Sequence, residues 1–351
     1  MNFNPEMLIL AREAEGLTQS ALALLLSVQQ GTISKMEAGL LSPSEDTMEK
    51  LATALNAPKS FFFQADRVFG FNSTVFFHRK REALPDKVLR KLHAFMNLTR
   101  MRVERLLRSI AASPPMFRQL SLDEYKSAEE VACLARSMWM LPAGPIRNVT
   151  ETIENAGGIV VRFDFCTRQI DAVSEWVPGF PPIFLVNSNS SITGDRLRLT
   201  LAHEIGHILM HRFPSPDMEK EANAFAAEFL MPRREIKASL YGLTIAKLAQ
   251  LKRVWKVSMA ALAMRAYELQ TISEMQRRYI FMNFAKRGYK TREPVETDVP
   301  VEMPCALETL VKAHLNELGY STRQLMELLF FSDEVVFKAV YLGGAGRLSL
   351  V

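Results

Sequence analysis

The middle of the chain contains the run Leu199-Thr-Leu-Ala-His203-Glu204-Ile-Gly-His207-Ile-Leu-Met210, in which two histidines and a glutamate form the pattern H-E-x-x-H. The run is otherwise largely apolar and indicates a helix. On a helix, a spacing of four residues puts His203 and His207 on one face, where they can share one metal ion. Glu204, beside the first histidine, can act as a base on a water that the ion makes acidic. These residues predict the core of a zinc hydrolase.

A catalytic zinc usually has three protein ligands, so a third ligand is expected elsewhere in the chain. The segment Met218–Pro232 has its apolar residues on one stripe and predicts an amphipathic helix that the proline ends. Glu219 and Glu221 flank this stripe on opposite sides, and periodicity does not choose between them. Asn223 lies one turn after Glu219 and could orient a metal-bound histidine through a hydrogen bond. Glu221 and Glu228 are predicted to lie on a solvated face.

The sequence around these residues resembles the ImmA/IrrE metallopeptidases. The resemblance runs from Asp195 through the zinc motif to Glu219-x-x-Ala-Asn-x-Phe-Ala-Ala-x-x-Leu-Met-Pro, and roughly residues 128–290 fit it in all. Further matching pieces are Gly144-Pro-Ile, Ile153-Glu-Asn-Ala-Gly-Gly-Ile-Val-Val, Ile170-Asp-Ala-Val-Ser and Leu251-Lys-x-x-Trp-Lys-Val-Ser-Met-Ala-Ala-Leu-Ala-Met-Arg-Ala.

The resemblance implies a zincin fold of the gluzincin type. It implies His203 and His207 as metal ligands, Glu219 as the third ligand by alignment on Ala222-Asn223, and Glu204 as the general base. Zinc is the implied metal, and the ligand types leave manganese and iron open. Proteins of this family cut helix-turn-helix repressors in response to stress or to signals from mobile elements.

The N-terminal residues 4–66 predict a series of short helices. The expected ranges are Pro5–Glu15, Thr18–Leu25, Gln29–Ala38, Ser44–Leu55 and a short last helix near Ser60. Thr18 is a good N-cap, and Gly39 suits a helix C-terminus. The segment resembles the XRE/Cro-type helix-turn-helix through the order Leu17-Thr-Gln, Val28-Gln-Gln-Gly-Thr-Ile-Ser-Lys-Met-Glu-Ala-Gly, Pro43-Ser and Thr47-x-x-Lys-Leu-Ala-x-Ala-Leu.

In that motif the second helix lies in the major groove, with its first residues at the base edges. Glutamine pairs with adenine, lysine reaches guanine or phosphate, and a threonine methyl can touch thymine. The candidate base readers are therefore Gln29, Gln30, Thr32 and Lys35. Two more polar residues are placed for phosphates, and these are Gln19 and Ser34. Ile33 and Met36 should face the core. The alternative is that the fold serves only in protein interaction.

Charge is unevenly distributed along the chain. Residues 1–66 have four Lys or Arg against eight Asp or Glu, a net of −4, whereas residues 67–108 have eleven against three, a net of +8. Because phosphate neutralisation supplies most DNA affinity, the N-terminal domain alone should bind weakly. The basic segment could lie along a DNA backbone or bind acidic protein, although a charge run is usually a solvated helix.

Composition is that of an ordinary globular protein, with 48% apolar and 23% charged residues in a chain of 351. We expect two to three domains. The absence of a long apolar stretch or a basic leader predicts no membrane association and a cytoplasmic location. Three widely spaced cysteines suggest a reducing compartment, and Cys166 is expected to be a buried, inert thiol.

The predicted fold class is α+β, mostly α, in four segments. These are a helix-turn-helix domain (1–66), a basic helical connector (67–127), a zincin-like peptidase domain with a small sheet (128–240), and a helical region that could be a helix-turn-helix-like docking module (241–351). Strands are expected near Gly158–Phe163, Ala172–Glu175 and Ile183–Val186. In zincins the strand that borders the cleft binds extended substrate, and the candidate here is the run Pro182–Asn187.

The predicted protein is a DNA-binding regulator whose zinc endopeptidase cleaves a helix-turn-helix repressor, or itself, in a stress or mobile-element response. Its expected partners are double-stranded DNA and that repressor, and a homodimer is compatible with the sequence. The alternatives are a transcription factor whose zinc fold only senses a signal, and a toxin–antitoxin or phage-type control protein that mainly binds a partner. An intact Glu204 favours the peptidase, because a retired site would be expected to lose it.

Overall fold

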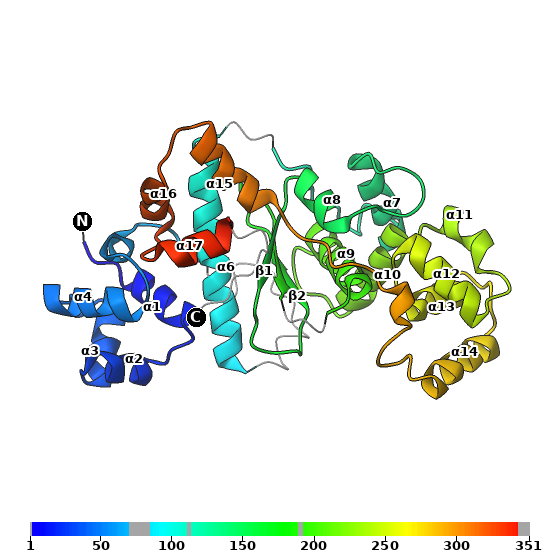
Figure 1. The fold of residues 1–351 in the computed structure, drawn as a ribbon, viewed down its shortest axis with the longest axis horizontal. Helices are drawn as coiled ribbons and strands as arrows, with labels where there is room; N and C mark the ends of the chain where they lie inside the picture. Colours follow the sequence, from blue (N-terminus) through cyan, green and yellow to red (C-terminus); the bar gives the residue numbers. More distant parts are fainter. Residues whose placement is uncertain (1, 70–84, 111–113, 189–191, 343–351) are drawn as a thin grey trace.

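The computed structural model describes residues 2–69, 85–110, 114–188 and 192–342. Helices predominate, and one small sheet lies near the middle of an elongated molecule (Figure 1). The predicted α+β, mostly α fold class is confirmed. No helix within the described ranges combines the length and apolarity that crossing a bilayer requires.

The N-terminal region consists of α1 (Pro5–Ala14), α2 (Gln19–Leu26), α3 (Gln30–Glu37), α4 (Glu45–Ala54) and the 3₁₀ helix η1 (Lys59–Phe63). The predicted ranges of α1 to α4 are confirmed to within one residue. Local chemistry explains this agreement, since the Thr18 hydroxyl accepts a hydrogen bond from the Ala21 amide and the Ser44 hydroxyl accepts one from the Thr47 amide. The core includes Leu8, Leu22, Ile33, Leu51 and Phe62.

Helix α6 (Asp86–Leu107) lies between the N-terminal helices and the sheet and contacts three neighbours (Figure 1). Ala94 and Met101 join the N-terminal core, Leu106 joins the C-terminal helices, and the Phe95 ring stacks on Phe163 of the sheet at 3.9 Å. The expectation of a solvated helix is therefore wrong for most of α6, in which the exposed residues are Asp86, Lys87 and Arg90 near its start. Residues 70–84 and 111–113 of the predicted basic connector lie outside the described ranges.

Buried arginines explain how a basic helix can occupy the core. The Arg105 guanidinium lies 2.5 Å from a carboxylate oxygen of Asp66, and Arg100 donates to the carbonyl of Arg67 at 2.8 Å. Their aliphatic stems add apolar surface beside the leucines and phenylalanines of the helix. A charge count over residues 67–108 cannot reveal this, because the partners lie far away in sequence or on the backbone.

The sheet consists of β1 (Ile159–Phe163), β2 (Ala172–Glu175) and β3 (Ile183–Asn187). The strand order is β1-β3-β2, with β1 parallel and β2 antiparallel to β3. Ile159 is paired with Ile183, and Val173 with Leu185. Strand β3 is thus central and paired on both sides, so its expected role at the cleft border is wrong. Its unbroken apolar run reflects burial on both faces.

The two faces of the sheet pack against different layers. Leu185 of β3 faces α6, whereas Phe184 faces the opposite layer, in which α8 (Val149–Asn155) and α9 (Gly194–Met210) contact the strands. Behind them lie α7 (Ala128–Met138) and α10 (Met218–Leu230). A side chain at Gly206 would place its Cβ 3.1 Å from the Phe225 ring, so this glycine lets α10 approach α9 closely.

The remaining chain is helical, as predicted. Its elements are α11 (Arg233–Ile236), η2 (Lys237–Leu240), α12 (Ile245–Trp255), α13 (Met259–Glu268), α14 (Glu274–Lys286), η3 (Val295–Thr297), α15 (Ala306–Asn316), α16 (Thr322–Leu329) and α17 (Glu334–Tyr341). Helices α11 to α14 form the end of the molecule that lies opposite the N-terminal helices (Figure 1). The division at residues 66, 127 and 240 stays a proposal about which segments fold independently.

After α14 the chain returns past the layer of α8 and α9 to α6 (Figure 1). The carboxylate of Glu302 accepts hydrogen bonds from two amides at the start of α8 and pairs with Arg198 of α9. Conversely, the carboxylate of Glu154 in α8 accepts hydrogen bonds from the amides of Cys305 and Ala306 at the start of α15. Each carboxylate thus caps a helix of the other segment, which ties the C-terminal helices to the sheet layer.

Candidate metal centre and DNA-facing surface

Helix α9 presents both histidines of the H-E-x-x-H motif on its buried side. The Nε2 atoms of His203 and His207 lie 2.9 Å apart. Glu219, in the first turn of α10, lies with one carboxylate oxygen 3.6 Å from the first of these atoms and the other 3.5 Å from the second. The three donor atoms lie within 4.8 Å of one another, as the ligands of a single ion must. Glu221 is not part of this group.

In both histidines the Nε2 atom is directed at the other ring and at Glu219, and the hydrogen bond made by Nδ1 decides which nitrogen carries the proton. Nδ1 of His203 lies 3.0 Å from Oδ1 of Asn223, a carbonyl oxygen that can only accept. The Nδ1 atom must therefore carry the proton, and Nε2 of the neutral ring keeps its lone pair. The predicted hydrogen bond between Asn223 and a histidine of the motif is present, with the amide oxygen as acceptor.

His207 is oriented by a longer chain of partners. Its Nδ1 lies 3.0 Å from Nδ1 of His211, and Nε2 of His211 lies 2.9 Å from the carboxylate of Glu221. Because a carboxylate accepts, His211 donates from Nε2 and accepts at Nδ1, so His207 donates from Nδ1. Its Nε2 lone pair then faces the cluster as well. Glu221, predicted to lie on a solvated face, is half-buried, and its carboxylate ends this chain of hydrogen bonds.

The donor set fits a zinc ion. Two imidazole lone pairs and a carboxylate directed at one point repel each other unless a cation lies between them. Two histidines and one glutamate are also a frequent ligand set of catalytic zinc. Burial lowers the pKa of His211, while its bond to Glu221 works in the opposite direction. The lowered pKa favours the neutral form of His211, which is the form that the hydrogen bonds from His207 and to Glu221 require.

Glu204 lies beside the histidines on α9 and is buried. Its Oε2 accepts a hydrogen bond of 2.7 Å from the hydroxyl of Ser174, which belongs to the edge strand β2. The strand thereby holds the carboxylate of the candidate base. The sequence assigns no role to Ser174, and its single signal is a small polar residue in a buried strand.

Glu228, on the same helix as Glu219, is buried rather than solvated as predicted. It forms an ion pair with Arg265 of α13 and accepts a 3.0 Å bond from the amide of Arg233. The error has a physical reason, because a second layer of helices covers the face of α10 that the sequence pattern leaves polar. This buried pair joins α10 to α13.

The three cysteines are free and exposed, so the expectation that Cys166 is buried is wrong. Cys305 has the most altered thiol. Burial and the adjacent carboxylate of Glu154 raise the pKa of Cys305 to about 11. This thiol is exposed but chemically quiet at neutral pH.

At the other end of the molecule, α2 and α3 form the helix-turn-helix. The turn between them is made by Ser27, whose φ is 55°, and Gln29 is the N-cap of α3. Ile33 and Met36 are buried as predicted. Among the candidate DNA-contacting residues, Thr32 and Ser34 are half-buried, and the exposed ones are Gln29, Gln30 and Lys35.

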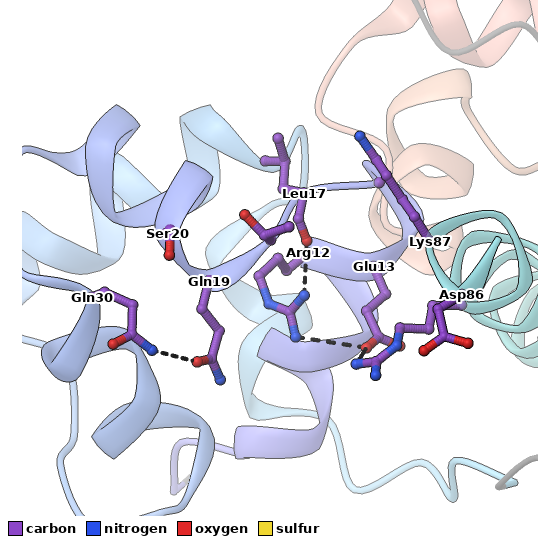
Figure 2. A pocket seen from close by; sticks show the side chains of 11 residues that line it. Arg12, Glu13, Leu17, Gln19, Ser20, Gln30, Asp86 and Lys87 are labelled. Carbon is purple, nitrogen blue, oxygen red and sulfur yellow. Dashed lines mark hydrogen bonds and ion pairs between the residues drawn. The ribbon is translucent and has the colours of Figure 1, made fainter.

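Gln19, at the start of α2, is bonded to Gln30 at the start of α3 (Figure 2). Its side-chain oxygen accepts from Gln30 at 2.7 Å, and its amide nitrogen donates to Glu37 at 2.7 Å. Glu37 in turn accepts from Arg12 at 2.5 Å. The network fixes the end of α3 where base contacts are predicted. The DNA contacts themselves stay predictions.

Comparison with known families matches two parts of this chain. A family described as IrrE N-terminal-like domain matches residues 154–267, which include α9 and α10. A family described as helix-turn-helix matches residues 8–62. No curated protein matches the chain. The chain thus joins an XRE-type helix-turn-helix domain at its N-terminus to an IrrE-like peptidase-family domain that contains the candidate metal centre.

Proposed function

We propose that this protein is a DNA-binding regulator that cleaves a helix-turn-helix repressor with a metal-dependent endopeptidase site. The observation that carries the proposal is the convergence of His203, His207 and Glu219 beside a buried Glu204. The repressor as substrate is the expectation that the family resemblance raised.

His203, His207 and Glu219 would hold the metal, for which zinc is the preferred ion. When bound, a zinc ion would polarise the scissile carbonyl and make water acidic. Glu204 would take the proton of the attacking water and then deliver it to the leaving amine. The 2.7 Å bond from Ser174 keeps this carboxylate in one orientation between the two transfers. Asn223 and His211 would hold the ligand rings through their Nδ1 atoms.

Strand β2 is the proposed binding edge for the substrate. It pairs on one side with β3, and no further strand pairs with it among the described residues. Ser174 on this strand is bonded to Glu204, so a peptide added to the free edge would pass close to the candidate base. Backbone pairing binds extended peptides without requiring a particular sequence, and side-chain pockets then add specificity.

The test is cleavage of candidate repressors by the full-length chain. Purified protein loaded with zinc is incubated with helix-turn-helix repressors from the same genome, and products are followed on a gel. We expect Glu204→Gln to keep its metal and to lose cleavage by about 10²- to 10⁴-fold. The matched control is Glu129→Gln, an exposed residue of α7.

Three outcomes separate the hypotheses. Cleavage by wild type and by Glu129→Gln, but not by Glu204→Gln, supports the peptidase. Equal cleavage by all three proteins would show that Glu204 is not the base. Tight repressor binding without cleavage by the metal-loaded wild type would instead support the partner-binding alternative.

A further inference from the structure

The first turns of α6 lie next to the proposed DNA-facing side of the helix-turn-helix domain. Lys87 lines a pocket of about 550 Å³ together with Gln19 and Gln30 (Figure 2). Arg90 also lines this pocket. We propose that these two cations bind the phosphate backbone of DNA, so that the DNA footprint extends from the helix-turn-helix domain onto α6. This inference rests on the proposed DNA-binding function and names a part of the surface that performs it.

The helix-turn-helix domain has few cations available for phosphates. Arg12 is buried against Glu37. Lys50 lies 2.7 Å from Asp46, and Lys59 lies within 2.8 Å of two glutamates of α4. Of the four cations in residues 1–66, only Lys35 has no carboxylate partner within the described part of the chain. Because counterion release supplies most of the affinity for DNA, a domain of net charge −4 needs cations from elsewhere.

The cations of α6 are exposed on the required side. Lys87 is exposed, and no carboxylate within the described ranges lies in ion-pair contact with it. Its Cε lies 3.5 Å from where a Cβ of Gly16 would be, two residues before Thr18, the N-cap of α2. In helix-turn-helix complexes the helix before the recognition helix crosses the backbone, and helix N-termini receive phosphates. Lys87 therefore adds charge where a phosphate is expected to approach.

Two carboxylates also line the pocket and limit its charge. The carboxylate of Glu13 lies 3.6 Å from the guanidinium of Arg12 and 3.5 Å from that of Arg90, so its charge is divided between two cations. Asp86 is the first residue of α6, where a negative charge offsets the positive end of the helix dipole. The Arg90 side chain is 55% exposed, so its guanidinium can turn from Glu13 towards a phosphate at little cost.

The position of α6 is fixed by the rest of its length. Ala94 and Met101 pack in the N-terminal core, and Phe95 stacks on the sheet. The two cations therefore stand on a rigid helix rather than on a loop, and a phosphate contact there requires little ordering of the backbone. The basic residues Arg79, Lys80 and Arg81 lie outside the described residues, and the proposal does not use them.

The experiment measures the salt dependence of DNA binding by the full-length chain. The probe is a fluorescent duplex from the region upstream of its own gene, titrated between 50 and 200 mM salt. We expect the double variant Lys87→Gln, Arg90→Gln to lower the slope of log K against log salt by roughly 2, about 0.9 for each phosphate contact. At 0.1 M salt the affinity should fall roughly five- to tenfold per cation.

The matched control is Arg108→Gln, Lys312→Gln, which removes the same charge from two exposed residues that pair with glutamates on their own helices. We expect its slope to equal that of wild type within about 0.5. Circular dichroism and thermal unfolding check that all proteins are folded. An equal fall in both double variants would mean that net charge alone acts, and it would overturn the proposal.

A third variant separates this inference from the proposed function. Gln29→Ala, Gln30→Ala alters the predicted base readers on α3. If wild type binds no duplex even at 50 mM salt, the DNA-binding function itself fails. If wild type binds and the α3 variant binds less well, but Lys87→Gln, Arg90→Gln keeps the wild-type slope, then only the role of α6 is refuted.

Discussion

The candidate metal centre and the DNA-facing surface are both built on a pair of helices, but they position their side chains in different ways. At the candidate metal centre both motif histidines are buried, and each is bonded through Nδ1, His203 to Asn223 and His207 to His211. On α3 the residues Gln29 and Lys35 are exposed. Geometry at the first site is therefore fixed before any ligand arrives, whereas the second depends on charge and on contacts that form with the partner.

The difference predicts that single substitutions have larger effects at the metal centre. A removed buried group leaves its partners without hydrogen bonds in a low dielectric, where that loss is costly. An exposed side chain exchanges a contact for water at little cost. The following expectations run from the largest effect to the smallest.

Loss of the carboxylate ligand should have the largest effect. We expect Glu219→Ala to weaken zinc binding by more than about a hundredfold, since a ligand should matter more than the groups that orient it. Zinc affinity is measured by competition with a chromogenic chelator. Lys220→Ala, between the two glutamates on α10, is the control and should bind zinc as wild type does. Wild-type affinity in Glu219→Ala would contradict the proposed ligand set.

Removal of the chain behind His207 should have a smaller effect on the same quantity. We expect His211→Ala or Glu221→Gln to weaken zinc binding by about 10- to 100-fold, because His207 loses the partner that fixes its ring and its proton. The chelator assay again applies. If Glu221→Gln weakened zinc binding more than Glu219→Ala, the roles of the two glutamates would have to be exchanged.

Cys305 is exposed, like Gln29 and Lys35, but its thiol is hydrogen-bonded to Glu154, as the histidines of the candidate metal centre are bonded to their neighbours. Its reactivity therefore tests whether exposure or bonding has the larger effect. Its pKa of about 11 keeps the folded thiol protonated up to a higher pH than the unfolded one. Alkylation at pH 8 should thus be at least about tenfold slower in the folded than in the urea-unfolded protein, and should rise as the pH approaches 11. Mass spectrometry of the labelled peptide measures both rates, and equal rates would refute the assignment.

A single base reader should have the smallest effect. We expect Gln30→Ala to lower DNA affinity by about 1 kcal/mol, roughly fivefold, at the low end for a base contact because Gln30 is already bonded to Gln19. The salt slope should stay at the wild-type value, since no phosphate contact is lost. Fluorescence anisotropy with the upstream duplex measures both quantities. A changed slope would indicate that Gln30 acts on the backbone instead.

Local features of the sequence determined much of this protein. Capping residues such as Thr18 and Ser44 mark helix starts, and a spacing of four residues brings His203 and His207 together on one helix face. These features depend on neighbours within a few residues, so they can be derived without knowing the rest of the fold. The alternation of apolar residues likewise predicted all three strands of the sheet.

The tertiary structure decided what depends on residues distant in sequence. It brought Glu219 rather than Glu221 to the histidines, placed β2 rather than β3 at the sheet edge, and buried most of α6 between three neighbours. Helical periodicity places both glutamates beside the apolar stripe and does not distinguish them. The family resemblance implies Glu219, and the packing of α10 against α9 is what brings its carboxylate to His203 and His207. Strand order and helix burial are set by the same long-range packing, which no local pattern contains.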